Sequence, residues 1–123
     1  MNKPKEKSHL PSKAQIAEYQ IVVPFLRATY NEISDLSKKK QDGVLNKLKV
    51  DMINRILKRV KTVLAEEPGI EFLELLDDIA LPTNSDAALI LRTFLAATQK
   101  FQDDYERWDK TRSGKRRFSK EDP

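Results

Sequence analysis

The stretch Ile16–Leu36, IAEYQIVVPFLRATYNEISDL, decides the fold class of this 123-residue chain. Its apolar side chains return at steps of three and four residues, which is the period of an α-helix that buries one face. The positions that set this period are Ile16, Tyr19, Val23, Leu26, Tyr30 and Ile33. The spacing predicts a helix from about Ser12 to about Ser37.

Pro24 lies inside this predicted helix, where a proline removes one backbone hydrogen bond and costs about 3 kcal/mol. The apolar period nevertheless keeps its phase on both sides of the proline, and Pro24 itself falls on the polar face of the helical wheel. We therefore expect a kinked helix that continues through Pro24. A helix that begins at Pro24 is the alternative.

Three further helical segments follow. The segment from about Val44 to about Glu66 carries apolar residues over about half of its circumference, so this helix should touch two neighbours. A short helix is predicted from about Ile70 to about Ala80, closed by Pro82, and a long one from Asp86 to about Lys110. The candidate N-caps of the last helix are Thr83, Asn84 and Ser85.

Three long helices and one short helix, joined by short connections, predict an all-α, antiparallel up-and-down bundle. The length of the chain suits a single domain. We expect this domain to span residues 12–110. Residues 1–11 and 111–123 carry few apolar side chains and several basic ones, which predicts two flexible basic tails.

The charge of the chain is distributed unevenly. Residues 38–61 hold nine basic and two acidic side chains, whereas residues 62–91 hold seven acidic side chains and no basic one. Two adjacent segments of opposite sign indicate electrostatic matching, either within the chain or between chains.

Several kinds of chemistry have no residues to carry them. The chain lacks cysteine, which excludes disulfides, thiolate metal sites and cysteine nucleophiles, and its only histidine, His9, falls in the predicted N-terminal tail. The three glycines are isolated, so no Gly-rich phosphate loop exists. We see no signal peptide and no apolar run of membrane-spanning length, and we expect a cytoplasmic protein with no cofactor and no enzymatic activity.

The feature most like an enzyme site is a row of carboxylates, Glu71, Glu74 and Asp77, with Asp78 beside them. All-α nucleotide pyrophosphohydrolases hold magnesium with acidic side chains at such helical spacing, and hard cations prefer oxygen ligands. Those enzymes, however, direct carboxylates from two facing helices into the core. Here the acidic arc is predicted opposite the apolar one, which indicates a solvated face. We keep the magnesium-dependent hydrolase as a third hypothesis.

Nucleic-acid binding is the second hypothesis. We expect the outward strip of the second helix to include Asp51 and Asn54 among several basic residues. In this hypothesis those basic residues contact phosphates, together with the basic C-terminal tail. The strip has no interleaved aromatic residue to stack on bases, whereas the tail has one. The candidate contacts are Lys47, Lys58, Lys61, Lys115, Arg116, Arg117 and Phe118.

The first hypothesis is a non-enzymatic helical module for protein interaction or oligomerisation, which could be a small subunit of a larger assembly. The evidence for this hypothesis is surplus apolar surface. The second helix has a wide apolar stripe, and the last helix is apolar on nearly all sides at its start. Together they present more apolar surface than a single small bundle readily buries. We expect a protein partner, with a second copy of the chain as the leading candidate. The predicted interface residues are Val50, Ile53, Leu57 and Leu64.

Overall fold

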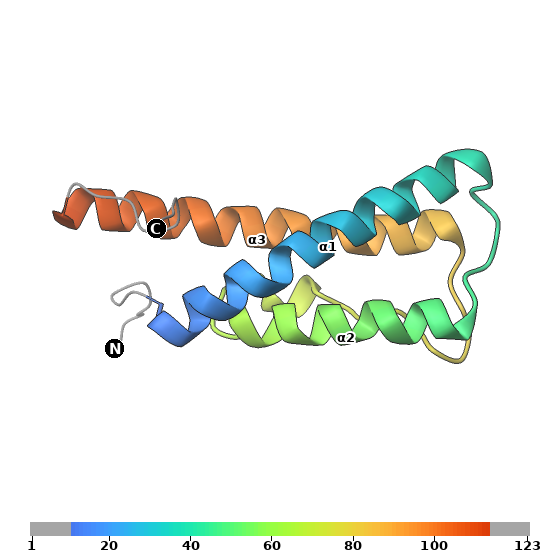
Figure 1. Cartoon of the computed structure of the whole chain (residues 1–123), viewed down its shortest axis with the longest axis horizontal. Coiled ribbons are helices and arrows are strands. Elements are labelled where there is room, and N and C mark those ends of the chain that lie inside the picture. Colours follow the sequence, from blue (N-terminus) through green and yellow to red (C-terminus); the bar gives the residue numbers. More distant parts are fainter. Residues whose placement is uncertain (1–10, 114–123) are drawn as a thin grey trace.

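Three helices packed against one another form the protein. The computed structural model describes residues 11–113, with side chains through residue 107. The helices are α1 (Lys13–Lys39), α2 (Lys47–Val63) and α3 (Asn84–Ser113). In Figure 1, α1 runs diagonally across the molecule, and it packs against both of the other helices. The prediction of an all-α fold is confirmed for the described part of the chain, where the only bridge between extended residues is an isolated one.

The three helices do not alternate in direction as the predicted up-and-down bundle would. Figure 1 shows α1 running one way and both α2 and α3 returning the other way. Residues 64–83 carry the chain back from the end of α2 to the start of α3, and they contain only one short helical turn. The described chain therefore has three helices where the sequence predicts four.

The first helix is continuous through Pro24, which lies inside α1 with its side chain exposed. The alternative of a helix that begins at Pro24 is therefore wrong. Ser12 caps the helix: its side chain accepts a hydrogen bond from the Gln15 backbone N–H at 3.0 Å, and the Gln15 side chain accepts one from the Ser12 N–H at 2.9 Å. Such a reciprocal capping box satisfies two backbone donors that an open helix end would leave unpaired.

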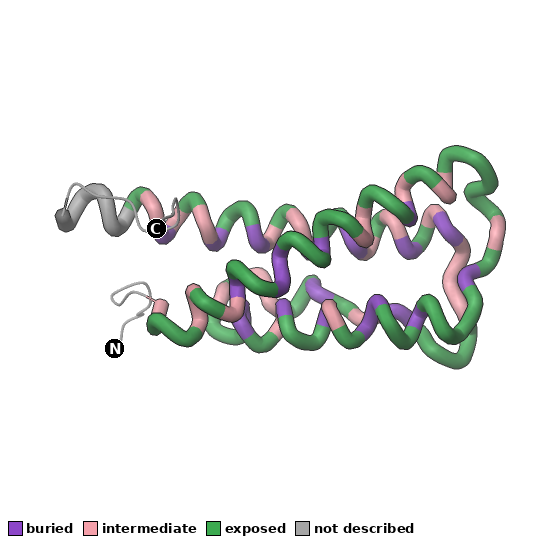
Figure 2. The backbone as a smooth tube through the Cα atoms, viewed as in Figure 1, coloured by how far each residue is buried: buried purple, intermediate pink, exposed green. Residues whose placement is uncertain are grey.

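The core lies on the inner sides of the three helices, where Figure 2 shows the buried positions along each tube. Burying these side chains supplies the main free energy that favours folding. The largest side chains that are almost wholly inaccessible to solvent are Phe94, Leu26, Leu57, Leu64, Leu91, Val50, Val60 and Thr98.

Tyr19 joins α1 to α3. Its ring lies 5.4 Å from that of Phe101, centroid to centroid, and its hydroxyl lies 3.1 Å from the Thr98 carbonyl oxygen and 2.9 Å from Gln102 Oε1. Burial raises the pKa of Tyr19 to about 12. The hydroxyl therefore stays protonated at neutral pH and serves as a donor in this interface.

The segment after α2 differs most from the sequence prediction. A helix was predicted from Ile70 to Ala80, but only Ile70–Phe72 form a helical turn, the 3₁₀ helix η2. Residues 73–83 then run over the helices without regular structure, and we call them the crossing segment. The predicted apolar face is divided: Leu73 and Leu76 are buried, whereas Phe72 and Ile79 are 70% and 89% exposed.

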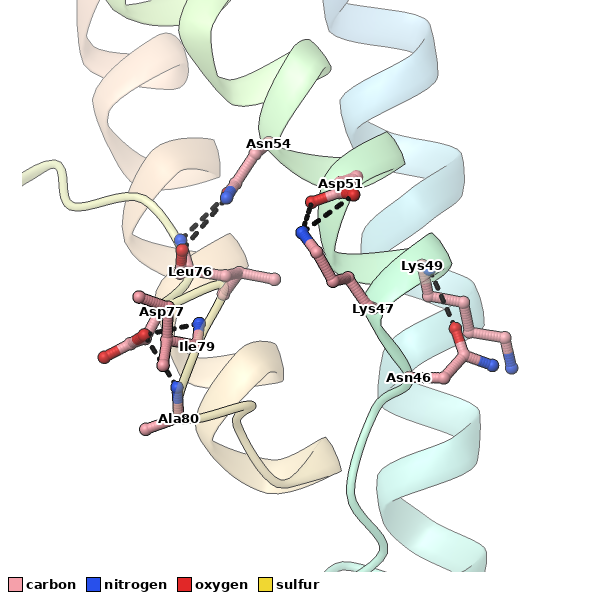
Figure 3. Close-up of polar contacts among 9 residues, drawn as sticks. All are labelled: Asn46, Lys47, Lys49, Asp51, Asn54, Leu76, Asp77, Ile79 and Ala80. Atoms are coloured by element: carbon pink, nitrogen blue, oxygen red, sulfur yellow. Dashed lines mark hydrogen bonds and ion pairs between the residues drawn. The ribbon is translucent and has the colours of Figure 1, made fainter.

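One side chain of α2 explains this departure. Asn54 is buried, its Nδ2 donates to the Leu76 carbonyl oxygen at 2.9 Å, and its Oδ1 accepts from the Leu76 N–H at 2.9 Å (Figure 3). The Asn54 amide thus forms hydrogen bonds with both the N–H and the C=O of Leu76. In a helix these two groups would instead form hydrogen bonds with other backbone groups of the same helix. Asn54 was expected to face solvent, but it holds the crossing segment against α2.

Asp77 turns the crossing segment toward α3. Its Oδ1 accepts from the backbone N–H groups of Ile79 at 2.8 Å and Ala80 at 2.9 Å, and these hydrogen bonds lower the pKa of the Asp77 carboxyl. Such a turn uses the aspartate side chain where a helix would use a backbone carbonyl.

The start of α3 is tied to the loop between α1 and α2. The Asn84 backbone N–H donates to the Gly43 carbonyl at 2.7 Å, and its Nδ2 donates to the Lys40 carbonyl at 2.8 Å. Thr83 Oγ1 accepts from the Asp86 N–H at 3.1 Å, which makes Thr83 the N-cap among the three candidates. The two loops therefore close one end of the molecule together.

We predict that Gly43→Ala destabilises the protein by about 1 to 3 kcal/mol. A Cβ at this position would lie 2.9 Å from Asn84 Nδ2 and 3.3 Å from the Lys40 carbonyl oxygen, and the asparagine cannot move without losing its hydrogen bond. Gly69→Ala is the matched control, because its Cβ would meet no atom closer than 4.0 Å. Urea unfolding should show a gain of about 0.4 to 1 kcal/mol for the control; equal effects of the two substitutions would contradict the account of Gly43.

We predict that Asn54→Ala costs about 2 to 3 kcal/mol, because it leaves the buried N–H and C=O of Leu76 without their partner. Asn31→Ala removes the same side chain from an exposed position of α1 and should change the free energy of unfolding by no more than about 0.5 kcal/mol. Urea unfolding of both variants measures the difference. A loss below about 1 kcal/mol for Asn54→Ala would show that the amide does not hold the crossing segment.

Candidate protein-interaction site

Four large apolar side chains remain exposed beside the contact between α1 and α2. Ile21 and Phe25 of α1 are 51% and 61% exposed, and Leu48 and Met52 of α2 are 69% and 50% exposed. Within each helix the two residues are four positions apart, so they lie on one face. We call these four residues the seam surface.

An ion pair shows that the two helices present these residues on the same side. Glu18 of α1 and Arg59 of α2 pair across the seam, with 2.7 Å between Arg59 Nη2 and Glu18 Oε1. Phe25 lies seven residues after Glu18, and Met52 lies seven residues before Arg59. Because the two helices run in opposite directions, both steps lead toward the same end of the molecule, and after two turns each returns to nearly the same helix face. Phe25 and Met52 therefore lie on the sides of α1 and α2 that the ion pair joins, although α1 crosses α2 diagonally (Figure 1).

The Glu18–Arg59 pair closes one end of the seam surface with two parallel hydrogen bonds. The bond from Arg59 lowers the pKa of the Glu18 carboxyl, and Glu18 raises the pKa of the Arg59 guanidinium. Because the pKa of Glu18 is lower in the folded chain, the pair stabilises the fold above the unfolded-state pKa, and this contribution is lost as the pH falls through the folded-state pKa. Both side chains are in contact with solvent, so the contribution is small.

The interface residues predicted from sequence lie elsewhere. Val50, Ile53, Leu57 and Leu64 are at most 5% exposed, in the core of the single chain. The middle of the α2 stripe faces the other elements of its own chain, and only the edge of the stripe, at Leu48 and Met52, reaches solvent. The width of the stripe was the correct signal for surplus apolar surface, but it could not show which edge stays uncovered.

The basic strip predicted on α2 is interrupted. Lys47 pairs with Asp51 at 3.1 Å, and Asn54 is buried under Leu76, so its predicted outward position is wrong (Figure 3). Lys58 is exposed and Lys61 is half-buried. The remaining predicted nucleic-acid contacts lie outside the described residues; they are Lys115, Arg116, Arg117 and Phe118.

Three exposed cations of α2 form a basic rim. Lys49 and Arg55 stand three residues before and after Met52, about 60° to either side of it, and Lys58 stands four residues after Asn54, on the side of α2 nearer the crossing segment. All three side chains are exposed, and among the described residues they form no ion pair. We call Lys49, Arg55 and Lys58 the basic rim.

The carboxylates predicted for a magnesium site do not converge. Because residues 73–80 are not helical, Glu74, Asp77 and Asp78 have lost their helical spacing, and Asp77 is engaged with two backbone N–H groups. Across the described part of the chain, no group of three or more histidine, aspartate or glutamate side chains is placed to hold a metal ion.

A cavity of about 230 Å³ lies between the turns after α2 and the middle of α3. Its walls include Leu64, Ile70 and Leu73 on one side and Ala96 and Ala97 of α3 on the other, and its lining is almost wholly apolar. Pockets for small-molecule ligands usually measure about 300 to 1,000 Å³ and add a few convergent polar groups. This cavity is smaller than such pockets, and little of its lining is polar.

Comparison with protein-family models, curated proteins and solved structures gives no match. Among the described residues, no helix has the length and apolar character that a membrane crossing requires.

We predict that the seam surface and the core respond differently to truncation. Leu57→Ala should cost about 2 to 5 kcal/mol, because the leucine is completely buried. Met52→Ser should cost only about 1 kcal/mol, since half of the methionine is already in solvent. Urea unfolding of the two variants measures both values. Comparable losses would show that Met52 belongs to the core.

Proposed function

We propose that the protein is a non-enzymatic, cytoplasmic helical module that binds another protein chain through the seam surface and serves as a small subunit of an assembly. The single observation that carries the proposal is the exposure of Ile21, Phe25, Leu48 and Met52 on the sides of α1 and α2 that the Glu18–Arg59 pair joins. Scattered exposed apolar residues are ordinary, but a group on the same side of two neighbouring helices favours an interaction site.

The chemistry of the seam surface suits a protein partner. A large apolar side chain moved from water to an interface contributes about 1.5 to 3 kcal/mol when it is fully buried, and these side chains start about half exposed or more. Phe25 supplies an aromatic ring and Met52 a flexible thioether, and both residue types are enriched at interfaces. Two rows of residues four positions apart also suit an amphipathic segment laid along them.

Nucleic-acid binding is the second candidate, and the exposure of the basic rim is the observation that favours it. Exposed cations without ion pairs can neutralise phosphates. However, the rim lies beside aliphatic side chains and one exposed phenylalanine, where burial of apolar surface would contribute more than phosphate contacts. We therefore rank a protein partner first.

The test is affinity capture from the native cells with three baits: the wild-type protein, the seam variant Phe25→Ser/Met52→Ser, and the control Leu89→Ser. Leu89 of α3 is 61% exposed, as is Phe25, but it lies outside the seam surface. Each capture is run with and without nuclease, and the bound proteins are identified by mass spectrometry.

We expect the wild-type and control baits to retain the same proteins with and without nuclease, and the seam variant to lose them. Identical captures by the wild-type bait and the seam variant would overturn the proposal. Loss of every captured protein on nuclease treatment would favour the nucleic-acid candidate.

A further inference from the structure

Several of the opposite charges on α2 and on the chain that follows it have no ion-pair partner among the described residues. Glu71, Glu74 and Asp78 are exposed, and within the described residues none of them forms an ion pair. The basic rim is unpaired as well. The electrostatic matching that the sequence indicates is therefore available between chains.

The acidic side chains accompany two of the most exposed apolar residues of the protein. Phe72 is 70% exposed and Ile79 is 89% exposed, and each directly follows a carboxylate in the chain. We call these five residues the acidic edge: Glu71, Phe72, Glu74, Asp78 and Ile79. This edge combines apolar side chains with negative charge, as the seam surface and basic rim combine apolar side chains with positive charge.

Met52 of the seam surface and Asn54 lie on opposite sides of α2. Asn54 holds the crossing segment, and at about 100° per residue Asn54 stands about 200° from Met52 around the helix. One molecule therefore cannot bring its own acidic edge onto its own seam surface while the Asn54–Leu76 contact is kept. Both surfaces can be occupied at once by two different neighbours.

We propose that the seam surface binds the acidic edge of a second copy of the chain, so that copies associate head to tail. Phe72 and Ile79 of one molecule pack on Phe25, Leu48 and Met52 of the next, and the flanking carboxylates meet Lys49 and Arg55 of the basic rim. This assignment rests on the proposed function and names the partner. Because the two contacting surfaces differ, the association continues into chains unless a ring closes.

Charge and size favour this arrangement over a symmetric dimer. Seam against seam would bring two basic rims into one interface, and juxtaposed like charges oppose association. Only a few large side chains take part on each side, so the contact falls at the small end of specific interfaces, below about 1,200 Å² of total buried surface. We therefore expect weak association that rises with concentration.

Light scattering of purified, nuclease-treated protein over a concentration series tests the proposal. We use the seam variant Phe25→Ser/Met52→Ser and the edge variant Phe72→Ser/Ile79→Ser, with Glu74→Lys/Asp78→Lys as a second edge variant that keeps the apolar residues. All replaced side chains are at least half exposed or are exposed carboxylates, and circular dichroism confirms that each variant keeps its helices.

The wild-type protein and the control Leu89→Ser should grow in mean mass with concentration, and each variant alone should stay monomeric. An equimolar mixture of a seam variant and an edge variant should form dimers and nothing larger, because each molecule retains only one working surface. Association of the wild-type protein should also weaken at about 1 M salt, where the Debye length is about 3 Å.

Two results would overturn the head-to-tail proposal. A wild-type protein that stays monomeric up to its solubility limit excludes self-association, and association of the edge variant or the seam variant on its own indicates a symmetric contact. Neither result removes the proposed function, because affinity capture that depends on the seam surface would still identify a protein partner of different sequence.

Discussion

The paired hydrogen bonds between the Asn54 amide and the backbone of Leu76 determine the arrangement of the rest of the protein. A buried asparagine is costly unless its donor and acceptor are both satisfied, and an extended backbone offers both groups on one residue. The contact holds the crossing segment against α2, with Leu73 and Leu76 buried. The chain can then return to the start of α3 without a fourth helix.

This path gives the molecule two unlike surfaces. The crossing segment covers one side of α2 and, with η2 before it, leaves Phe72 and the carboxylates exposed, while the other side of α2 meets α1 and leaves Met52 and Phe25 uncovered. A fourth amphipathic helix would have buried Phe72 and Ile79 instead. The same contact that completes the core therefore also produces the exposed apolar residues on which the proposed assembly depends.

The sequence predicted the helices well and the connecting segment poorly. The period of three and four residues in α1 was long enough to be unambiguous, even across Pro24, and Thr83 was among the candidate caps of α3. The spacing in residues 70–80 is ambiguous. A short run with apolar residues three positions apart fits a helix, and it also fits an extended chain that buries every third side chain. A side chain 22 positions away, Asn54, decided between them, and local spacing carries no signal of it. The candidate site shared this difficulty: the surplus apolar surface was visible in the stripe of α2, but the uncovered edge depended on where α1 and the crossing segment lie.

Native-state hydrogen exchange of the backbone amides in residues 74–80 tests the central claim most directly. The Leu76 N–H donates to a buried side chain and should exchange slowly, as the core amides of α2 do, whereas Glu74 and Leu75, which donate no hydrogen bond within the described residues, should exchange rapidly. Replacement of Asn54 by alanine should remove the protection of Leu76 alone. Uniform protection from Glu74 to Ala80 would indicate a helix, and rapid exchange of Leu76 would show that Asn54 does not hold the segment; either result would contradict the account.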